Sequence, residues 1–280
     1  MSDPVKLPVW GTVGLALRWT LAFILRHPVV TVAYAAAVLA SNLTSQLGEG
    51  TAAAAPPAGQ FVWLNLLLLI VSVLISIMFA LMVHNEVLRG HAGFDAATFG
   101  SGPGRTFGYL LDLVVIGLIA VAVLIVAVIA LALIGVGGNI LLGKSGSTVV
   151  TVIGGIATVI VAIGLGARLT LRLPSRAIGQ PAPWKAIWRM GRGNTLRLIG
   201  MGLLLWLFAA VLMLPILGWG FMYLPHLDPA QPLLRVPFLL LVYSAVISPI
   251  LTIAHFALLS VAFATLRPAE ADGTGAAAFT

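Results

Sequence analysis

The sequence predicts an all-α membrane protein, a polytopic bundle of six transmembrane helices. Of its 280 residues, 60% are hydrophobic and only 8% are charged, and the mean hydropathy is +1.11. A soluble domain carries about 25% charged residues, so this chain has too few charges to cover a globule with a hydrated surface. Apolar stretches of roughly 20 residues, the length that crosses a bilayer, recur along the chain.

Six stretches satisfy this length requirement and form a predicted transmembrane domain over 28–266. The second has no charged residue, and the third carries only Asp112, near its start. The fifth and sixth contain Pro215 and Pro249, which membrane helices tolerate as kinks. The predicted spans lie near 28–47, 61–83, 107–134, 148–171, 195–224 and 233–265.

The first stretch is the least apolar, and two interpretations of it are open. It is either a retained span or the core of a cleaved signal peptide, with the alanines of 52–55 as the cleavage site. The 27 preceding residues are long for such a leader, which favours a retained span. At the other end of the chain, residues 267–280 have the composition of a disordered tail.

The basic residues predict the orientation. The net charge is +7, and 13 of the 15 lysines and arginines lie on a single predicted side, which also holds both termini. Lysine and arginine accumulate on the cytoplasmic side of membrane proteins, so we expect both termini in the cytoplasm. Topology thus accounts for a charge that in a soluble protein would suggest a nucleic-acid partner, and we expect none.

Two segments on this side have the pattern of amphipathic helices that lie on the membrane surface. The first is the N-terminal region 1–27, for which a flexible leader is the alternative; the second is 183–191, where two tryptophans lie opposite Lys185 and Arg189. The apolar face of the first consists of Trp10, Val13, Leu17, Leu21 and Ile24.

The loop between spans four and five is basic and contains no acidic residue. Anionic lipid headgroups attract such segments by about 1 kcal/mol per Lys or Arg near the surface. The loop is therefore a candidate site for lipid phosphates, and the alternative is that its charge only fixes the topology. Its seven cations are Arg168, Arg172, Arg176, Lys185, Arg189, Arg192 and Arg197.

Polar residues inside the predicted spans need partners, because lipid offers none. Asp112 shares a helix face with Arg105 and Tyr109, and it fits either a proton or cation site or a structural ion pair, with the basic loop as another source of partners. A polar stripe in the sixth span either bonds to neighbouring helices or lines a solute path. The stripe consists of Ser244, Ser248, Thr252 and His255.

Motifs of enzymatic and metal chemistry are missing from the sequence. There is no cysteine, phosphate-binding loop, HExxH or GxSxG, and the five histidines are scattered. Of eight acidic residues only Asp112 lies clearly within a span, so paired carboxylates are not expected. We therefore expect no enzyme, no cofactor and no metal.

Three stretches carry a resemblance to a broad bacterial family of uncharacterised six-span inner-membrane proteins. They are Arg168–Leu198, His84–Gly90 and Leu258–Pro268. Similar units occur as the membrane domain attached to some glycerophosphodiester phosphodiesterases. The family pattern of arginine, proline, a tryptophan-containing amphipathic segment and Gly-Asn corresponds here to Arg168 or Arg172, Pro174, Trp188 and Gly193–Asn194. The resemblance implies the fold and a bacterial inner-membrane location, and it implies no reaction.

Two functions follow as hypotheses. The first is a non-enzymatic membrane protein that organises lipids or protein partners through its basic loop. The second is a small-solute or proton-coupled transporter or channel, lined by the stripe that includes His255. Small residues on one face of the fourth span predict close helix packing, within the chain or in a homo-oligomer. They are Thr151, Gly155, Thr158, Ala162 and Gly166.

Overall fold

The computed structural model describes residues 6–50, 58–91, 93, 95–99, 104–223 and 238–267, and for some of them, including 45–50, 58–62 and 134–151, it describes only the backbone path. Over these ranges the chain forms helices and no strand. The first five are α1 (Val9–Arg26), α2 (Pro28–Gly50), α3 (Ala58–Arg89), α4 (Ala96–Phe99) and α5 (Gly104–Leu169). The other four are α6 (Arg172–Ala177), α7 (Trp184–Gly191), α8 (Thr195–Tyr223) and α9 (Phe238–Leu266). The loop at 51–57 and most of the predicted tail lie outside the described residues.

The predicted all-helical, multi-pass fold is confirmed, whereas the count of six spans is not fixed. Five stretches of the described chain are long and apolar enough to cross a membrane, or six if α1 and α2 together form one bent span. Two of the five lie in α5, at Gly104–Ala130 and at Val152–Ala177, the second of which continues into α6.

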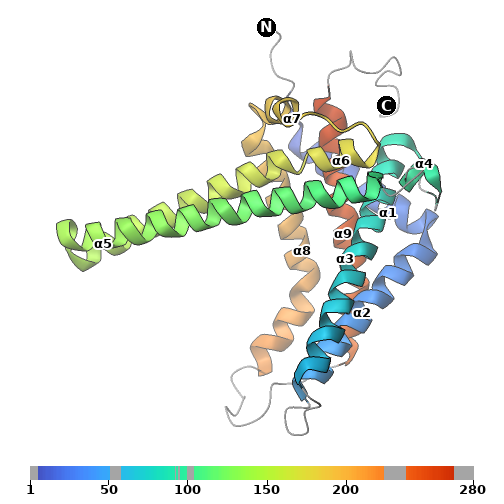
Figure 1. Cartoon of the computed structure of the whole chain (residues 1–280), viewed down its shortest axis with the longest axis horizontal. Coiled ribbons are helices and arrows are strands. Elements are labelled where there is room, and N and C mark those ends of the chain that lie inside the picture. The colour runs from blue at the N-terminus through green and yellow to red at the C-terminus, as the bar shows by residue number, and fades with distance from the viewer. Residues whose placement is uncertain are drawn as a thin grey trace.

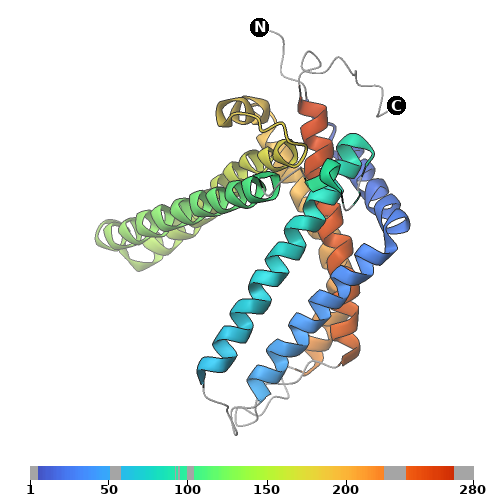
Figure 2. The same cartoon turned by 45° about the vertical axis from the view of Figure 1, so that its right-hand side comes forward.

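Helix α9 is the centre of the bundle. It packs against α1, α2, α3 and α8, and its buried residues include the small Ala254, Ala257 and Ala262 among larger apolar side chains (Figures 1 and 2). Small side chains let neighbouring helices approach closely, which replaces the hydrophobic driving force that lipid does not provide.

The α1–α2 elbow bends the chain by 97° at His27. Pro28 is the first residue of α2, where its missing N–H costs nothing, but the same residue cannot continue α1. The face of α1 that packs in the bundle carries the small or polar residues Thr12, Ala16 and Thr20 together with Phe23. Trp10 and Leu21, two members of the apolar face predicted to lie on the membrane surface, are exposed.

The α5 ribbon runs out from the bundle and back again as two arms that lie side by side in both views (Figures 1 and 2). We call these arms the α5 hairpin. It projects sideways from the end of the molecule where α4, α6 and α7 lie, whereas α3, α8 and α9 run away from that end. The hairpin meets α8 only near its base, so most of its apolar surface is uncovered.

Candidate functional site

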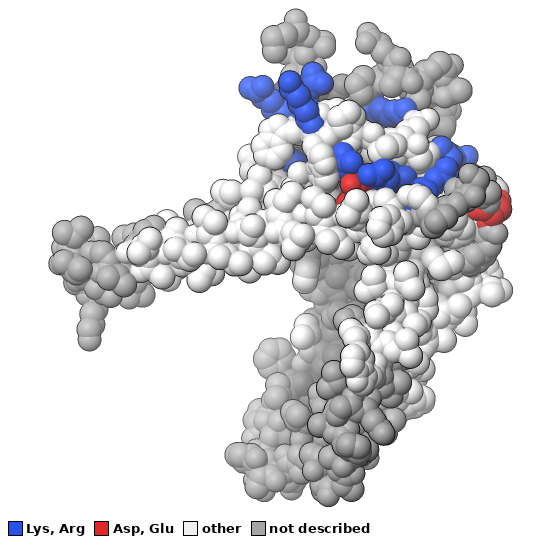
Figure 3. Space-filling model, in the orientation of Figure 1, with Lys and Arg blue, Asp and Glu red and all other residues white. Residues whose placement is uncertain are grey.

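The lysines and arginines whose side chains the structure describes gather at one end of the molecule, over α6, α7 and the adjoining helix ends (Figure 3). We call this region the cationic end. The apolar helices extend away from it, which is the arrangement that a charge bias across a membrane produces. The seven cations of the basic loop fall into two groups. Some contact other residues of the chain, and the others are exposed.

Asp112 and two arginines close the base of the α5 hairpin. Arg176 Nε donates to Asp112 Oδ2 at 2.8 Å, and Arg172 Nε lies 2.9 Å from Oδ1. The second contact lacks hydrogen-bond geometry and is an ion pair only. The exposed fractions of the three side chains are 4% for Asp112, 11% for Arg172 and 23% for Arg176. Arg105, the alternative partner, instead donates to the carbonyl of Thr98.

Two arginines of the basic loop hold α7 against α5 and α6. The guanidinium carbon of Arg172 lies 4.1 Å from the ring centroid of Trp184, and that of Arg168 lies 4.8 Å from Trp188. Both distances are within the range of cation–π attraction. Trp184 and Trp188 are four residues apart and share one face of α7, so this face meets both arginines.

Arg197 also has an internal role. It donates to the carbonyl of Leu7 at 3.1 Å, while the N–H of Leu7 donates to Asn194 Oδ1 at 3.0 Å. These bonds attach the segment before α1 to the start of α8. Four of the seven predicted lipid-phosphate candidates, Arg168, Arg172, Arg176 and Arg197, are therefore used in joining helices.

The other three, Lys185, Arg189 and Arg192, are exposed on α7 and just after it. They contact no acidic side chain among the described residues. Their spacing of four and three residues places them on one helical face, while Ile187 is buried on the opposite face. Trp188, next to this face, is 42% exposed. The predicted amphipathic segment is thus an anchored helix with a free cationic surface.

A buried polar hub, which we define as His84, Asn85 and Glu86, lies near the end of α3. His84 Nδ1 is 2.6 Å from Ser260 Oγ on α9, and its Nε2 is 3.1 Å from the Tyr109 hydroxyl on α5. Ser260 already donates its hydrogen to the carbonyl of Phe256. We therefore assign the hydrogen of His84 to Nδ1, with Nε2 accepting from Tyr109.

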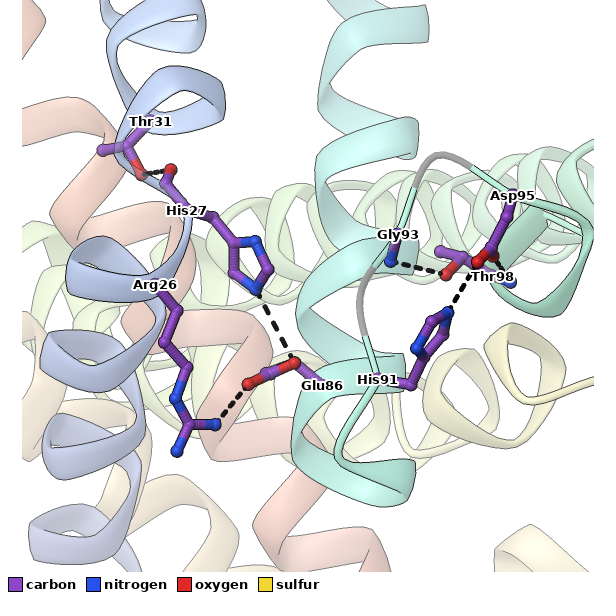
Figure 4. A network of polar contacts seen from close by, with 8 residues as sticks. All are labelled: Arg26, His27, Thr31, Glu86, His91, Gly93, Asp95 and Thr98. Atoms are coloured by element: carbon purple, nitrogen blue, oxygen red, sulfur yellow. Dashed lines mark hydrogen bonds and ion pairs between the residues drawn. The ribbon is translucent and has the colours of Figure 1, made fainter.

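Asn85 and Glu86 point to other neighbours of α3. The Asn85 amide nitrogen donates to carbonyls of Leu81, Thr98 and Ala177, which joins α3 to α4 and α6. Glu86 Oε1 is 2.5 Å from Arg26 Nη1 and its Oε2 is 3.7 Å from His27 Nε2, at the α1–α2 elbow (Figure 4). The second predicted span ended at residue 83, but α3 continues to Arg89, and Glu86 is buried in the last turn of the candidate span Ile70–Arg89.

A second polar contact set lies between α3 and α4, also in Figure 4. The backbone N–H of Thr98 donates to Asp95 Oδ1 at 3.0 Å, and His91 Nε2 lies 2.8 Å from Asp95 Oδ2. Both contacts favour the ionised carboxylate and lower the pKa of Asp95. This Asp95 contact begins the short helix α4, as capping aspartates do.

The turn after α6 is surrounded by arginines. Arg89 donates to the carbonyl of Ile178, and Arg267 donates to the Gln180 side chain at 2.8 Å. Gly179 between them has φ of +72°, and a Cβ there would lie 2.8 Å from Arg105 Nη2.

The substitution Gly179→Ala should therefore cost about 2 kcal/mol, combining the left-handed backbone with displacement of Arg105. Gly90→Ala is the matched control, since Gly90 has φ of +66° with nothing within 4 Å of a Cβ. Thermal unfolding in detergent should rank Gly179→Ala below Gly90→Ala. Equal stabilities would exclude a role for the Arg105 contact.

The polar stripe of α9 faces several neighbours. Asn42 of α2 donates to Ser244 Oγ at 3.1 Å, and the Tyr34 hydroxyl lies 3.5 Å from Thr252 Oγ1. These two members of the stripe bond across helices. Among the described residues Ser248 has no side-chain hydrogen bond, and the His255 side chain is exposed.

The sequence analysis missed the polar hub, although it named His84–Gly90 within the family resemblance. The available signal was three consecutive polar residues directly after an uninterrupted apolar span. We assigned them to a loop, whereas α3 continues beyond residue 83 because its neighbours satisfy these side chains. No family model, curated protein or solved structure matches the chain.

Proposed function

We propose that this protein is a non-enzymatic, multi-pass membrane protein that holds anionic lipid headgroups at its cationic end. The observation that supports this proposal is the exposed face of α7, formed by Lys185, Arg189 and Arg192. The other four basic-loop arginines contact residues of this same chain, whereas these three remain available for a ligand. The proposal places the cationic end and both termini in the cytoplasm of a bacterial cell, at its inner membrane.

The chemistry of this face suits a lipid phosphate. Three cations near a membrane surface together supply about 3 kcal/mol of attraction to anionic lipid. An exposed tryptophan such as Trp188 prefers the headgroup region, where its ring is in apolar surroundings and its N–H reaches water. An amphipathic helix with these features binds along the membrane surface, and α1, with exposed Trp10 and Arg18, is proposed to lie there as well.

The test is a headgroup titration of the purified protein. Replacing Lys185, Arg189 and Arg192 together by glutamine should weaken binding of phosphatidylglycerol at least tenfold, because most of the attraction is removed. Native mass spectrometry of detergent-solubilised protein measures the bound lipid. Phosphatidylcholine, which has no net charge, should bind both proteins equally weakly.

Two control variants separate charge from structure. Lys185→Arg with Arg189→Lys and Arg192→Lys keeps all three charges, so phosphatidylglycerol binding should persist. Arg18→Gln removes one exposed cation outside α7 and should have a smaller effect than the triple glutamine variant. If the triple glutamine variant retains parental phosphatidylglycerol affinity, α7 is not the lipid site.

A solute or proton path is the second candidate function, and one observation favours it. His255 is exposed although it lies within the apolar helix α9. Intramembrane ionisable residues often mark proton or ion pathways. Protein reconstituted in vesicles should then pass protons in response to a pH gradient, and His255→Ala should slow this flux. A proton flux no faster than that of protein-free vesicles would exclude the proton path.

The proposed family relationship rests on the sequence stretches Arg168–Leu198, His84–Gly90 and Leu258–Pro268. Arg168 and Trp188, two residues of that pattern, contact one another and fix α7. This contact gives a structural reason for the pattern, and it carries no phosphodiesterase activity to this chain.

A further inference from the structure

The α5 hairpin has a composition that does not suit its sideways position. Its two candidate spans are 27 and 26 residues long, and the first has a mean hydropathy of 3.4. At 1.5 Å per residue the first extends about 40 Å, which is enough to cross a hydrocarbon core of about 30 Å. The second continues through the turn after α5 into α6. If α8 and α9 cross the bilayer, the hairpin instead lies along the membrane plane beside the cationic end (Figure 1).

A helix that lies along the membrane surface needs one polar face. Residues 113–130 and 152–166 contain no charged residue at all. Large apolar side chains are exposed over most of the outgoing arm, among them Leu118, Val121, Leu124 and Ile129, although Ile116 and Ala127 are buried. Lipid headgroups and water are poor surroundings for such a surface, so the hairpin gains free energy by entering the hydrocarbon core.

The neighbouring helix α8 has a matching uncovered face. At the base of the hairpin, Gly164 is so close to α8 that a Cβ there would lie 3.0 Å from Thr195 and 3.5 Å from Ile199. Beyond this crossing the two helices diverge. On α8, the exposed residues Leu203, Trp206 and Leu217 share the helical face of Ile199.

The returning arm of α5 carries the complementary surface. Exposed Ile153, Ile160 and Val161 lie on the same helical face as Gly164. Continuing the existing Gly164 contact along both helices would therefore bring two apolar faces together. Gly117 on the outgoing arm and Gly166, two residues from the Gly164 crossing, have nothing within 4 Å of a Cβ, so bending there meets no neighbouring side chain.

We infer that the α5 hairpin closes against α8 in the bilayer, pivoting about the Gly164–Thr195 crossing. The sideways and closed positions are two states of one chain. The anchors Asp112–Arg176 and Tyr109–His84 lie at the base of the outgoing arm and stay in place. The arms beyond them move to run alongside α8 and span the membrane.

The chain has no cysteine, so disulfide trapping can test this closure directly. Ile153 lies 11 residues from Gly164, and Ala210 lies 11 residues from Ile199, which is about 16 Å along each helix from the crossing. Disulfides need Cα atoms within about 7 Å, so only helices lying side by side bring this pair together. The variant Ile153→Cys with Ala210→Cys, oxidised in native membranes, should form a disulfide within one chain.

A control pair reports that oxidation works. Gly164→Cys with Thr195→Cys lies at the crossing and should form a disulfide in either position. If the first pair prevents insertion, Ile160→Cys with Leu203→Cys tests the same faces nearer the crossing. A disulfide that joins two chains only would overturn the proposal in favour of a second copy. Absence of any disulfide, with the control pair oxidised, would also overturn it.

Discussion

Replacing Asp112 by asparagine should destabilise the fold by about 3–5 kcal/mol, the usual cost of removing one partner from a buried ion pair. The variant leaves Arg172 and Arg176, both largely buried, without their carboxylate. Because these residues join the outgoing arm of α5 to α6, the hairpin base should loosen first. Unfolding in a sodium dodecyl sulfate titration, followed by tryptophan fluorescence, measures the change.

The electrostatic origin of this loss can be tested by a second substitution. Arg176→Met in the Asp112→Asn background removes one uncompensated charge and should recover part of the stability. Asp95→Asn is the control for a carboxylate at the surface, and its effect should stay within about 0.5 kcal/mol. An Asp112→Asn protein as stable as the parent would show that the ion pair does not hold the hairpin base.

The helical, multi-pass fold could be predicted because it depends on local composition. An apolar stretch without charges has few alternatives to a membrane helix, and the chain repeats this pattern. The direction of the α5 hairpin could not be predicted in this way. It follows from contacts at the base, where Tyr109 and Asp112 meet partners from α3 and α6.

The location of the candidate site could be predicted from the sequence. Which of its cations bind other parts of the chain and which stay exposed could not. Seven cations in one loop indicate a basic surface, and helix periodicity places Lys185 and Arg189 on one side of α7. The sequence does not reveal that Arg168 and Arg172 stack on tryptophans 20 and 12 residues later, because such pairing depends on the turn after α6. For Asp112 the sequence left open whether Arg105 or a residue of the basic loop is the partner, and the structure places Arg172 and Arg176 beside it.

Removal of the His84 side chain should have the second largest effect on stability. His84→Ala leaves a cavity among α3, α5 and α9 and deprives the buried Tyr109 hydroxyl of its acceptor. Large-to-small changes at buried sites cost about 2–5 kcal/mol, and the unsatisfied hydroxyl adds to this. We therefore expect a loss of about 3 kcal/mol in the same sodium dodecyl sulfate titration.

The partners of His84 should contribute less, which distinguishes the packing of the ring from its hydrogen bonds. Hydrogen bonds between membrane helices contribute about 0.6 kcal/mol on average, since the unfolded helices in the membrane also find partners. Tyr109→Phe and Ser260→Ala should thus each cost about 1 kcal/mol or less, well below His84→Ala. Tyr109→Phe removes the hydrogen that Nε2 accepts, whereas Ser260→Ala removes the acceptor of the Nδ1 hydrogen. Nitrogen NMR shifts of His84 should therefore change most at Nε2 in the first variant, and a protonated Nε2 in the parent would contradict the assigned tautomer.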